Sequence, residues 1–254
     1  MAVASTGGNR QALPRGGCPA FPSIGRFSQA IGKTGRQVVL VDTGAGQSSR
    51  TTGAIRARLE GAGIRPKDVD TMILTHAHPD HIGDVIDSTG HAAFPNARYV
   101  LSEREWEFWT AARIDLRNLR IPEQAKATIQ AVARRCMGPL RQIELIGRDK
   151  EVVSGVRAIS APGHTPGHLA VLVSSDAQHL LNSGDAAVHP LHPEQPAWEN
   201  GFDLAADSAA ATRSRLLEFA VAENMHVMAF HFPFPSVGRV GASQRGAWEW
   251  TPGW

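Results

Sequence analysis

A cluster of residue types that bind metals lies directly after the apolar run 71–75, which is typical of a buried strand. Side chains two residues apart on extended backbone point the same way, so His76 and His78 can reach one ion. We expect a short helix over residues 82–86, with Asp80 at its N-cap and facing a second ion. Imidazole and carboxylate ligands favour zinc, but also manganese, iron or cobalt. The cluster is His76, His78, Asp80 and His81.

Further candidate ligands each follow an apolar segment elsewhere in the chain. Polar residues gathered where strands end indicate a ligand site at that end of the sheet. A histidine-rich surface turn, the alternative interpretation of the first cluster, does not account for these partners. The additional candidates are Asp42, His164, Asp185 and His231.

The composition is that of an ordinary globular protein. Hydrophobic residues make up 42% and charged residues 20% of the 254 residues, and the formal net charge is +2. No apolar stretch approaches the roughly 20 residues that span a bilayer, so no membrane insertion is expected. Lys and Arg are scattered, which argues against a nucleic acid partner. The two cysteines, Cys18 and Cys136, cannot form a thiolate site, so metal binding falls to the histidines.

The elements around these residues alternate between strands and helices, which predicts an α/β (α+β) fold in which residues 26–254 form a single domain. Residues 1–25 are rich in Gly and Pro and predict an irregular or mobile leader without a legible signal peptide. Helices are expected over 51–62, from a capping box of Ser102 and Glu105, over 121–137 and over 205–222. Strands are expected over 37–42, 71–75, 99–101, 152–153, 156–159, 169–173, 179–183 and 227–230.

In this order, the motifs resemble those of the metallo-β-lactamase superfamily over about residues 37–240. The resemblance implies a four-layer αββα sandwich with a dinuclear metal site at one sheet edge. It implies that Asp185 bridges both ions, that Asp42 braces a ligand loop from behind, and that His168 supports the site rather than binding metal. The implied ligands are His76, His78 and His164 for one ion and Asp80, His81 and His231 for the other.

Such a centre is suited to hydrolysis. Two divalent ions about 3.5–4 Å apart can share a bridging hydroxide and clamp the oxygens of an attacked carbonyl or phosphoryl group. Water is therefore the expected nucleophile, with Asp80 and Asp185 as the catalytic carboxylates and Asp80 relaying the proton. Ser160 and Ser183 lack the Gly-x-Ser-x-Gly setting of a nucleophilic serine.

The tail over residues 231–253 resembles the methyl parathion hydrolase-like branch of the superfamily. This branch implies a hydrophobic ester, lactone or phosphotriester, a small molecule, as substrate. The aromatic side chains expected at the pocket are Trp106, Phe108 and Trp109, or alternatively Trp198 and Phe202. Ordinary core packing is an equal alternative for each of the first three.

Other hydrolases share the metal motifs. Acyl-homoserine lactonases carry a tyrosine three residues after the bridging aspartate, where this chain has Val188. A quorum-quenching lactonase acting through its metals alone is the first alternative, and a β-lactamase-like amide hydrolase is the second. A metal-binding module without catalysis ranks last, because closed structural sites leave no open position.

The segment before residue 37 is shorter than in that branch, and residues 28–31 make a poor strand. An uncovered sheet edge would favour pairing with a second chain, so a homodimer is expected. The chain is expected to be soluble, with the cytoplasm and the periplasm both open as its compartment.

Overall fold

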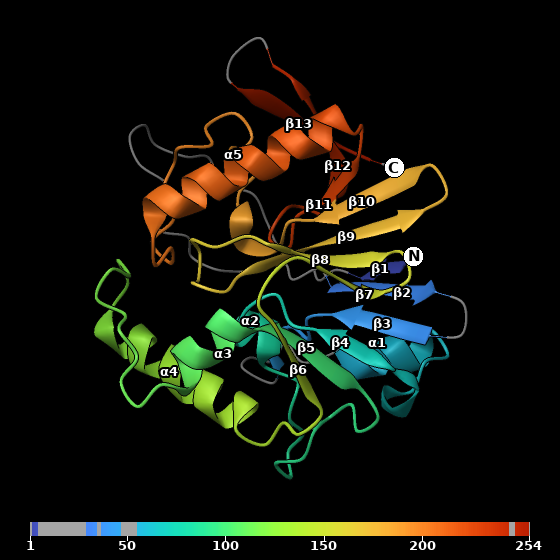
Figure 1. Ribbon diagram of the computed structural model, residues 1–254, viewed down its shortest axis with the longest axis vertical. Coiled ribbons are helices and arrows are strands. Elements are labelled where there is room, and N and C mark those ends of the chain that lie inside the picture. Colours follow the sequence, from blue (N-terminus) through green and yellow to red (C-terminus); the bar gives the residue numbers. More distant parts are fainter. Residues whose placement is uncertain (1, 5–28, 35–36, 47–54, 244–246, 254) are drawn as a thin grey trace.

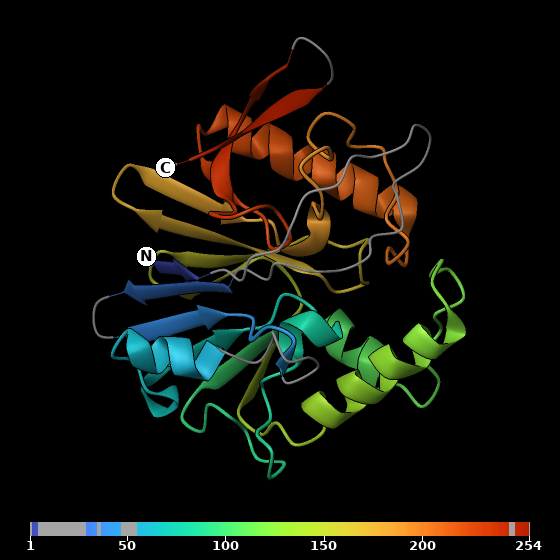
Figure 2. The ribbon, with the colours of Figure 1, turned by 180° about the vertical axis from the view of Figure 1, so that it is seen from behind.

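The computed structural model describes residues 2–4, 29–34, 37–46, 55–243 and 247–253. Two β-sheets face each other at the centre of the molecule, and helices cover the outer side of each (Figures 1 and 2). Helices from the first half of the chain lie on one side, and a long helix near residue 210 lies on the other. These four layers confirm the αββα sandwich that the sequence predicts.

The first sheet has the strand order β1-β2-β3-β4-β5-β6. Its β2 and β3 are antiparallel, whereas β3, β4, β5 and β6 run parallel to one another. Parallel neighbours place their carboxyl ends at the same edge, where ligands of open α/β sheets bind. The strands are β1 (Ala2–Ala4), β2 (Gln29–Thr34), β3 (Gln37–Val41), β4 (Thr71–Ile73), β5 (Arg98–Ser102) and β6 (Ile143–Ile146).

The second sheet has the order β13-β12-β11-β10-β9-β8-β7. Its β10 and β11 are parallel, and the other neighbours pair antiparallel. The strands are β7 (Lys150–Val153), β8 (Val156–Ser160), β9 (Leu169–Ser175), β10 (Gln178–Asn182), β11 (His226–Met228), β12 (Val237–Ala242) and β13 (Trp248–Pro252).

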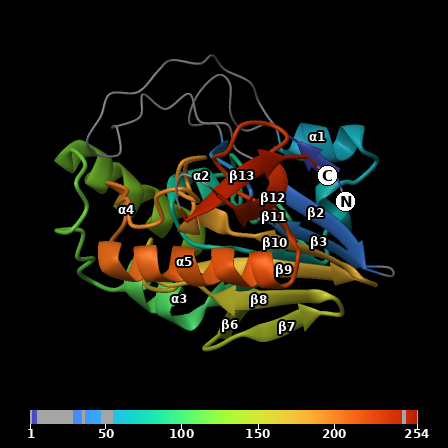
Figure 3. The same cartoon turned by 90° about the horizontal axis from the view of Figure 1, so that it is seen from above.

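The helices connect parallel strands and cover the sheets. Figure 3, seen from above, shows the last of them lying along the strands of the second sheet. They are α1 (Ile55–Gly61), α2 (Pro79–Ile82), α3 (Glu103–Thr110), α4 (Glu123–Met137) and α5 (Ala206–Ala222), with 3₁₀ turns η2 (Pro66–Asp68) and η3 (Gly184–Ala186).

Alternation along β3 shows how the layers are packed. Val39 and Val41 lie in the core between the sheets, while Val38 and Leu40 pack into the core beneath the helices of the first half. Successive side chains of a strand point to opposite faces, so a strand buried on both faces is apolar throughout. On the far side, Leu216 of α5 belongs to the core that covers the second sheet.

Several elements differ from the sequence prediction. Residues 2–4 form β1, so the expected irregular leader is wrong there, while residues 5–25 lie outside the described residues. Residues 28–31 were expected to be a poor strand, but residues 29–34 form β2, whose backbone pairs with β3 regardless of its weak side-chain pattern. Helix α1 begins at the first described residue after a gap, so the predicted helix over 51–54 stays untested.

The prediction of a helix over residues 82–86 is wrong except at Ile82, because α2 covers Pro79–Ile82. Its N-cap is His78, and Pro79 occupies its first turn, so Asp80 lies inside the helix rather than at its cap. Proline is favoured at a first helical position because its fixed φ suits the helix and its missing N–H is not needed. Strands β6, β12 and β13 were also not predicted.

Among the described residues, no helix is both long and apolar enough to cross a bilayer.

Candidate metal centre

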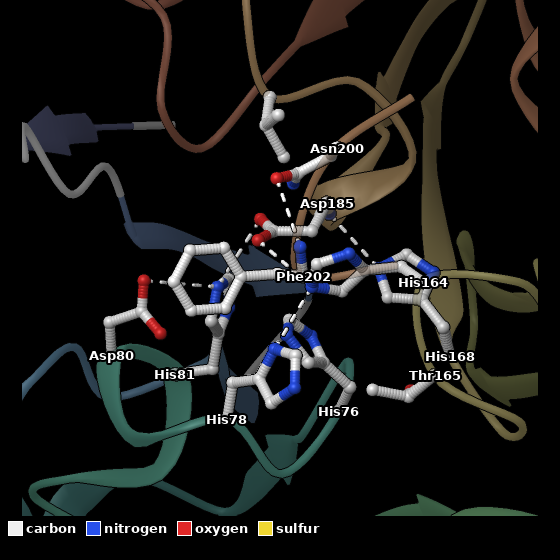
Figure 4. Close-up of polar contacts among 12 residues, drawn as sticks. His76, His78, Asp80, His81, His164, Thr165, His168, Asp185, Asn200 and Phe202 are labelled. Atoms are coloured by element: carbon white, nitrogen blue, oxygen red, sulfur yellow. Dashed lines mark hydrogen bonds and ion pairs between the residues drawn. The ribbon is translucent and has the colours of Figure 1, made fainter. Parts of the chain in front are cut away.

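The candidate ligands predicted from the sequence lie together where strands of both sheets end. The loops after β4, β8, β10 and β11 meet there and supply the histidines and carboxylates. Figure 4 shows labelled members of the set pointing toward one another. Their ligand atoms fall into overlapping groups, each spanning at most 4.8 Å. The set is His76, His78, Asp80, His81, His164, Asp185 and His231.

We call His76, His78 and His164 the three-histidine group. Nδ1 of His78 and Nε2 of His164 lie 2.9 Å apart. The ring of His76 lies 4.7 Å from that of His78 and 4.9 Å from that of His164, centroid to centroid. Two nitrogens on one tetrahedral zinc would be about 3.3 Å apart, so little movement would let these rings share an ion.

We call Asp80, His81 and His231 the Asp80 group. Oδ2 of Asp80 lies 3.4 Å from Nε2 of His231 and 3.8 Å from Nε2 of His81. All three therefore direct a ligand atom into one small volume. It lies closer to solvent than the volume within the three-histidine group, because the side chains of Asp80 and His231 are 27% and 21% exposed.

Asp185 lies between the two groups. Its Oδ1 is 3.2 Å from Nε2 of His81. Its Oδ2 is 3.1 Å from Nε2 of His231 and 3.4 Å from Nε2 of His164. One carboxylate thus faces ligands of both groups, which is the geometry that the predicted bridging role requires.

Unpartnered atoms test whether these residues suit metal ions. Among the described residues, Nε2 of His76, His78 and His81 and Oδ1 of Asp185 are buried without a hydrogen bond. Buried polar atoms are nearly always paired, because leaving one unpaired costs about 1–3 kcal/mol. Divalent cations would satisfy the atoms of His76, His81 and Asp185, whereas His78 would bind through Nδ1, the nitrogen that faces His164. Five imidazoles with two carboxylates are suitable ligands for zinc. The residues therefore fit a pair of divalent ions.

The electrostatics of the site favour cations. Burial, with help from neighbouring rings, holds the pKa of His76 and of His78 well below the usual value, so both rings present the neutral form that binds metal. Burial also opposes protonation of His81, but the carboxylates of Asp185, Asp42 and Asp80 outweigh it and raise that pKa. The concentration of negative charge beside His81 would be compensated by metal ions.

Asp42 braces the histidine cluster from behind. Its carboxylate accepts hydrogen bonds from the backbone N–H and the hydroxyl of Thr75, both at 2.8 Å, and lies 2.8 Å from Nδ1 of His81. The backbone of Asp42 is left-handed, with φ of 58°, which turns the chain at the end of β3. This arrangement fixes the His81 ring so that Nε2 faces Asp185.

His168 holds the loop of Asp185. Its Nδ1 lies 3.1 Å from the carbonyl of Ala161, and its Nε2 accepts a 2.9 Å hydrogen bond from the N–H of Asp185. Gly184 must be glycine here, because its φ is +51° and a Cβ would come within 2.6 Å of His168 Nε2. His168 therefore supports the candidate centre and directs no free nitrogen into it.

Asp203 was missed as a site residue; it lies in the turn just before α5. Its Oδ1 lies 2.8 Å from Nδ1 of His164, which turns Nε2 of that ring toward the centre. Arg213 of α5 lies 3.7 Å from the same carboxylate and donates to the carbonyls of Ala186 and Trp198. A carboxylate that hydrogen-bonds to a metal-binding histidine is common. Asp203 and His164 are 39 residues apart, however, so the sequence alone does not pair them.

Glu105 was also missed. The predicted capping box is wrong, since Ser102 is the N-cap of α3 without a side-chain cap hydrogen bond. Glu105 is instead fully buried, and its carboxylate accepts hydrogen bonds from the loops that carry the three-histidine group. Burial raises its pKa against the opposing effect of these hydrogen bonds.

The aromatic residues expected at the pocket take different places. Trp109 is wholly buried in the core, with its ring 5.7 Å from that of His78, so it underlies the centre and cannot wall an open pocket. Phe202 is 43% exposed, and its ring lies 6.3 Å from that of His78. Trp106 and Phe108 are half-buried against the core, and Trp198 is half-buried with its carbonyl bound by Arg213.

A separate hollow of about 430 Å³ is lined in part by Pro162, Gly163 and Pro166 of the loop that carries His164. Phe108, Leu204 and Arg104 are among its lining residues, and none of the candidate ligands is. Of the predicted pocket residues, Phe202 alone combines substantial exposure with a ring contact to a candidate ligand among the described residues.

Comparison with known proteins agrees with this geometry. The family model of the metallo-beta-lactamase superfamily matches residues 30–224. An N-acyl homoserine lactonase of Bacillus cereus is 28% identical over 174 residues, which cover 68% of this chain and 60% of the relative. The chain thus matches less than two thirds of that relative's length.

Solved structures resemble the whole architecture. AidC, a dizinc quorum-quenching lactonase in complex with its product, superposes with a TM-score of 0.81 at 28% identity. The match covers 91% of this chain and 80% of AidC. The hydrolase AbOPH of the beta lactamase superfamily has a TM-score of 0.79 with the same coverages, but at 23% identity it supports the fold alone.

Proposed function

The chain belongs to the metallo-beta-lactamase superfamily, and from this premise we propose that it is a metal-dependent hydrolase that opens the ring of a lactone with an apolar substituent. The observation that carries the proposal is the full set of candidate ligands within a fold similar to a dizinc lactonase. The first curated relatives are lactonases as well. This favours the lactonase alternative over the methyl parathion hydrolase-like branch that the tail indicates.

The residues would hold two divalent ions, with zinc the first candidate. His76, His78 and His164 would bind one ion, Asp80, His81 and His231 the other, and Asp185 both. When bound, two such ions activate water at neutral pH and polarise the attacked carbonyl. Asp80 is exposed enough to exchange a proton with solvent, and we assign it the relay of the proton to the leaving alkoxide.

Phe202 is proposed to receive the apolar part of the substrate. Its ring is 43% exposed and lies 6.3 Å from that of His78, so an acyl chain lying on it would leave the lactone at the candidate centre (Figure 4). The turn that carries it is fixed, because the N–H of Phe202 donates to Oδ1 of Asn200 at 3.2 Å and the N–H of Asn200 donates to Asp203 at 3.1 Å. Binding energy at this ring would orient the substrate without taking part in the chemistry.

Val188 favours a second candidate, the hydrolysis of aryl esters or phosphotriesters. It stands where the lactonase pattern places a tyrosine that would help the substrate carbonyl. Without that phenol, polarisation falls on the ions, which can clamp a phosphoryl oxygen as well as a carbonyl oxygen. A homodimer remains a separate prediction, which the molar mass in solution tests.

The test is a hydrolysis panel on protein reconstituted with zinc. It compares N-acyl homoserine lactones of different chain length, a nitrophenyl ester, an aryl phosphotriester and a chromogenic cephalosporin. We expect the largest kcat/KM for a lactone with a medium or long acyl chain and no turnover after chelation. A preference for the phosphotriester would select the second candidate, and unchanged turnover by metal-free protein would reject both.

A further inference from the structure

A buried carboxylate outside the ligand set joins the two loops that carry the three-histidine group. We propose that Glu105 is a positioning residue that locks these loops together and so sets the affinity of one ion position but not of the other. The inference rests on the proposed metal centre. It adds a residue that binds neither metal nor substrate.

Four donors surround the Glu105 carboxylate. Oε1 accepts from the N–H of Ala77 at 3.0 Å and from the indole N–H of Trp109 at 2.6 Å. Oε2 accepts from the hydroxyl of Thr165 at 2.7 Å and from the N–H of Gly167 at 2.9 Å. A carboxylate has about four acceptor positions, so its capacity is filled.

The donors come from the segments that present the ligands. Ala77 stands between His76 and His78, and Thr165 and Gly167 follow His164 in the second loop. Gly167 is 62 residues from Glu105 in the sequence. The Glu105 carboxylate thus connects both ligand-bearing segments to the first turns of α3. Displacing Glu105 would thus shift all members of the three-histidine group relative to one another.

Packing leaves this carboxylate no room to move. Glu105 is wholly buried, and a Cβ at residue 167 would come within 2.2 Å of its backbone nitrogen, so the second loop approaches α3 as closely as glycine permits. The indole that Oε1 binds also packs against the ring of His78. Glu105 therefore positions His78 in two ways. It binds the backbone N–H of Ala77, the preceding residue, and it holds the Trp109 indole that packs against the His78 ring.

Glutamine at this position would break the arrangement while keeping its shape. Replacing Oε2 by an NH₂ group still allows Thr165 to accept a hydrogen bond, because a hydroxyl can donate or accept. The N–H of Gly167 can only donate, so it would face another donor and the second loop would have to move. If the amide flipped, the same conflict would fall on Ala77 and Trp109.

The Asp80 group has a different support. His81 is held by Asp42, and its carbonyl accepts hydrogen bonds from Thr43. Within the described part of the chain, none of the hydrogen bonds of the Glu105 carboxylate reaches Asp80, His81 or His231. Loss of Glu105 should therefore act on one ion position selectively, which a general loss of stability would not do.

The experiment measures the affinity of each ion separately. Wild type, Glu105→Gln and the control Glu107→Gln are loaded with zinc, and both ions are titrated out with a chromogenic chelator. Glu107 lies on the same helix, is exposed, and loses the same charge on substitution. The visible spectrum of the cobalt-loaded proteins reports the geometry at the ligands.

We expect the three-histidine group to hold the tighter-bound ion, because its ligands are buried. Glu105→Gln should weaken this ion by about 10- to 100-fold, as loss of outer hydrogen-bonding partners of metal ligands does, with the weaker ion unchanged. The cobalt spectrum should change in Glu105→Gln and match wild type in Glu107→Gln. Equal affinities in the two variants, or equal losses at both ion positions, would overturn the inference.

If Glu105→Gln does not fold, Thr165→Val removes one of the four hydrogen bonds and leaves the carboxylate in place. It should weaken the same ion by roughly fivefold, in line with the typical net contribution of one hydrogen bond. An unchanged tighter ion in this variant contradicts the inference. If the wild-type protein binds no zinc, the proposed metal centre itself is refuted. This outcome is distinct from a failure of the inference about Glu105 alone.

Discussion

The two halves of the candidate metal centre differ in burial and in support. His76, His78 and His164 are at most 3% exposed, whereas the side chains of Asp80 and His231 are 27% and 21% exposed. The buried half packs against Trp109 in the core, whereas Asp80 and His231 of the other half reach solvent. The same kinds of ligand are thus placed in two different environments.

The two halves also differ in the residues that hold their ligands in place. Glu105 and Asp203 both act on the loops or rings of the three-histidine group. On the other side, Asp42 braces His81, which is buried, while Asp80 lies in the first turn of a four-residue helix. We infer that the buried half retains an ion while the exposed half exchanges its ion and meets the substrate. The following predictions test this difference, from the largest effect to the smallest.

Asp185→Asn should have the largest effect, because this carboxylate faces both halves. We expect kcat to fall by more than about 100-fold, the upper range for residues that only support ligands. Metal content should fall in both positions. Asp176→Asn, in the turn between β9 and β10, is the control, and a variant that still held two ions and full activity would refute the bridging assignment.

Of the two ions, Asp203→Asn should affect only the one in the buried half. The variant keeps its size but weakens the hold on Nδ1 of His164, so affinity for the tighter ion should fall by about 10- to 100-fold. Asp207→Asn, exposed in the first turn of α5, is the matched control. Chelator titration measures both ions, and a fall in affinity for the weaker ion with the tighter ion unchanged would contradict the division into two halves.

Phe202→Ala should affect substrate binding on the open side. Removing a ring that covers an acyl chain costs about 1.5 kcal/mol, so KM for a long-chain lactone should rise about tenfold with kcat nearly unchanged. A short-chain lactone should show little change. Leu145→Ala, an exposed apolar residue on β6, is the control, and an equal effect on both chain lengths would argue against the proposed role.

Thr43→Val should have the smallest effect and act on the exposed half. Its hydroxyl donates to the carbonyl of His81 at 2.9 Å and accepts from the N–H of Asp84 at 3.2 Å. Losing both should lower the free energy of unfolding by only about 1 kcal/mol, because the carbonyl of His81 keeps its hydrogen bond from the N–H of Thr43. Denaturant unfolding measures this, and release of the weaker ion should become faster while the tighter ion is unaffected.

The strands and candidate ligands could be predicted from the sequence because their signals are local. An apolar run ended by His, Asp or Gly marks both the strand and the residue at its end, as at 71–76. Parallel neighbours then bring such residues to one edge. These two rules account for the gathering of the candidate ligands.

The supporting residues could not be predicted in this way. Glu105 has the sequence setting of a capping box, and its burial depends on loops 28 and 62 residues away. Asp203 looks like the start of a helix until His164 is placed beside it. Trp109 is a similar case. The sequence shows an aromatic residue there, but only the packing of α3 decides whether the ring lies in the core or lines a pocket.

The most direct test of the account is the time course of metal release from zinc-loaded protein after rapid mixing with excess chelator, with activity followed in parallel. We predict two zinc ions per chain that leave in two phases of equal size, with lactone hydrolysis lost in the fast phase. A single phase that releases both ions together, or a content near one ion per chain, would contradict the account.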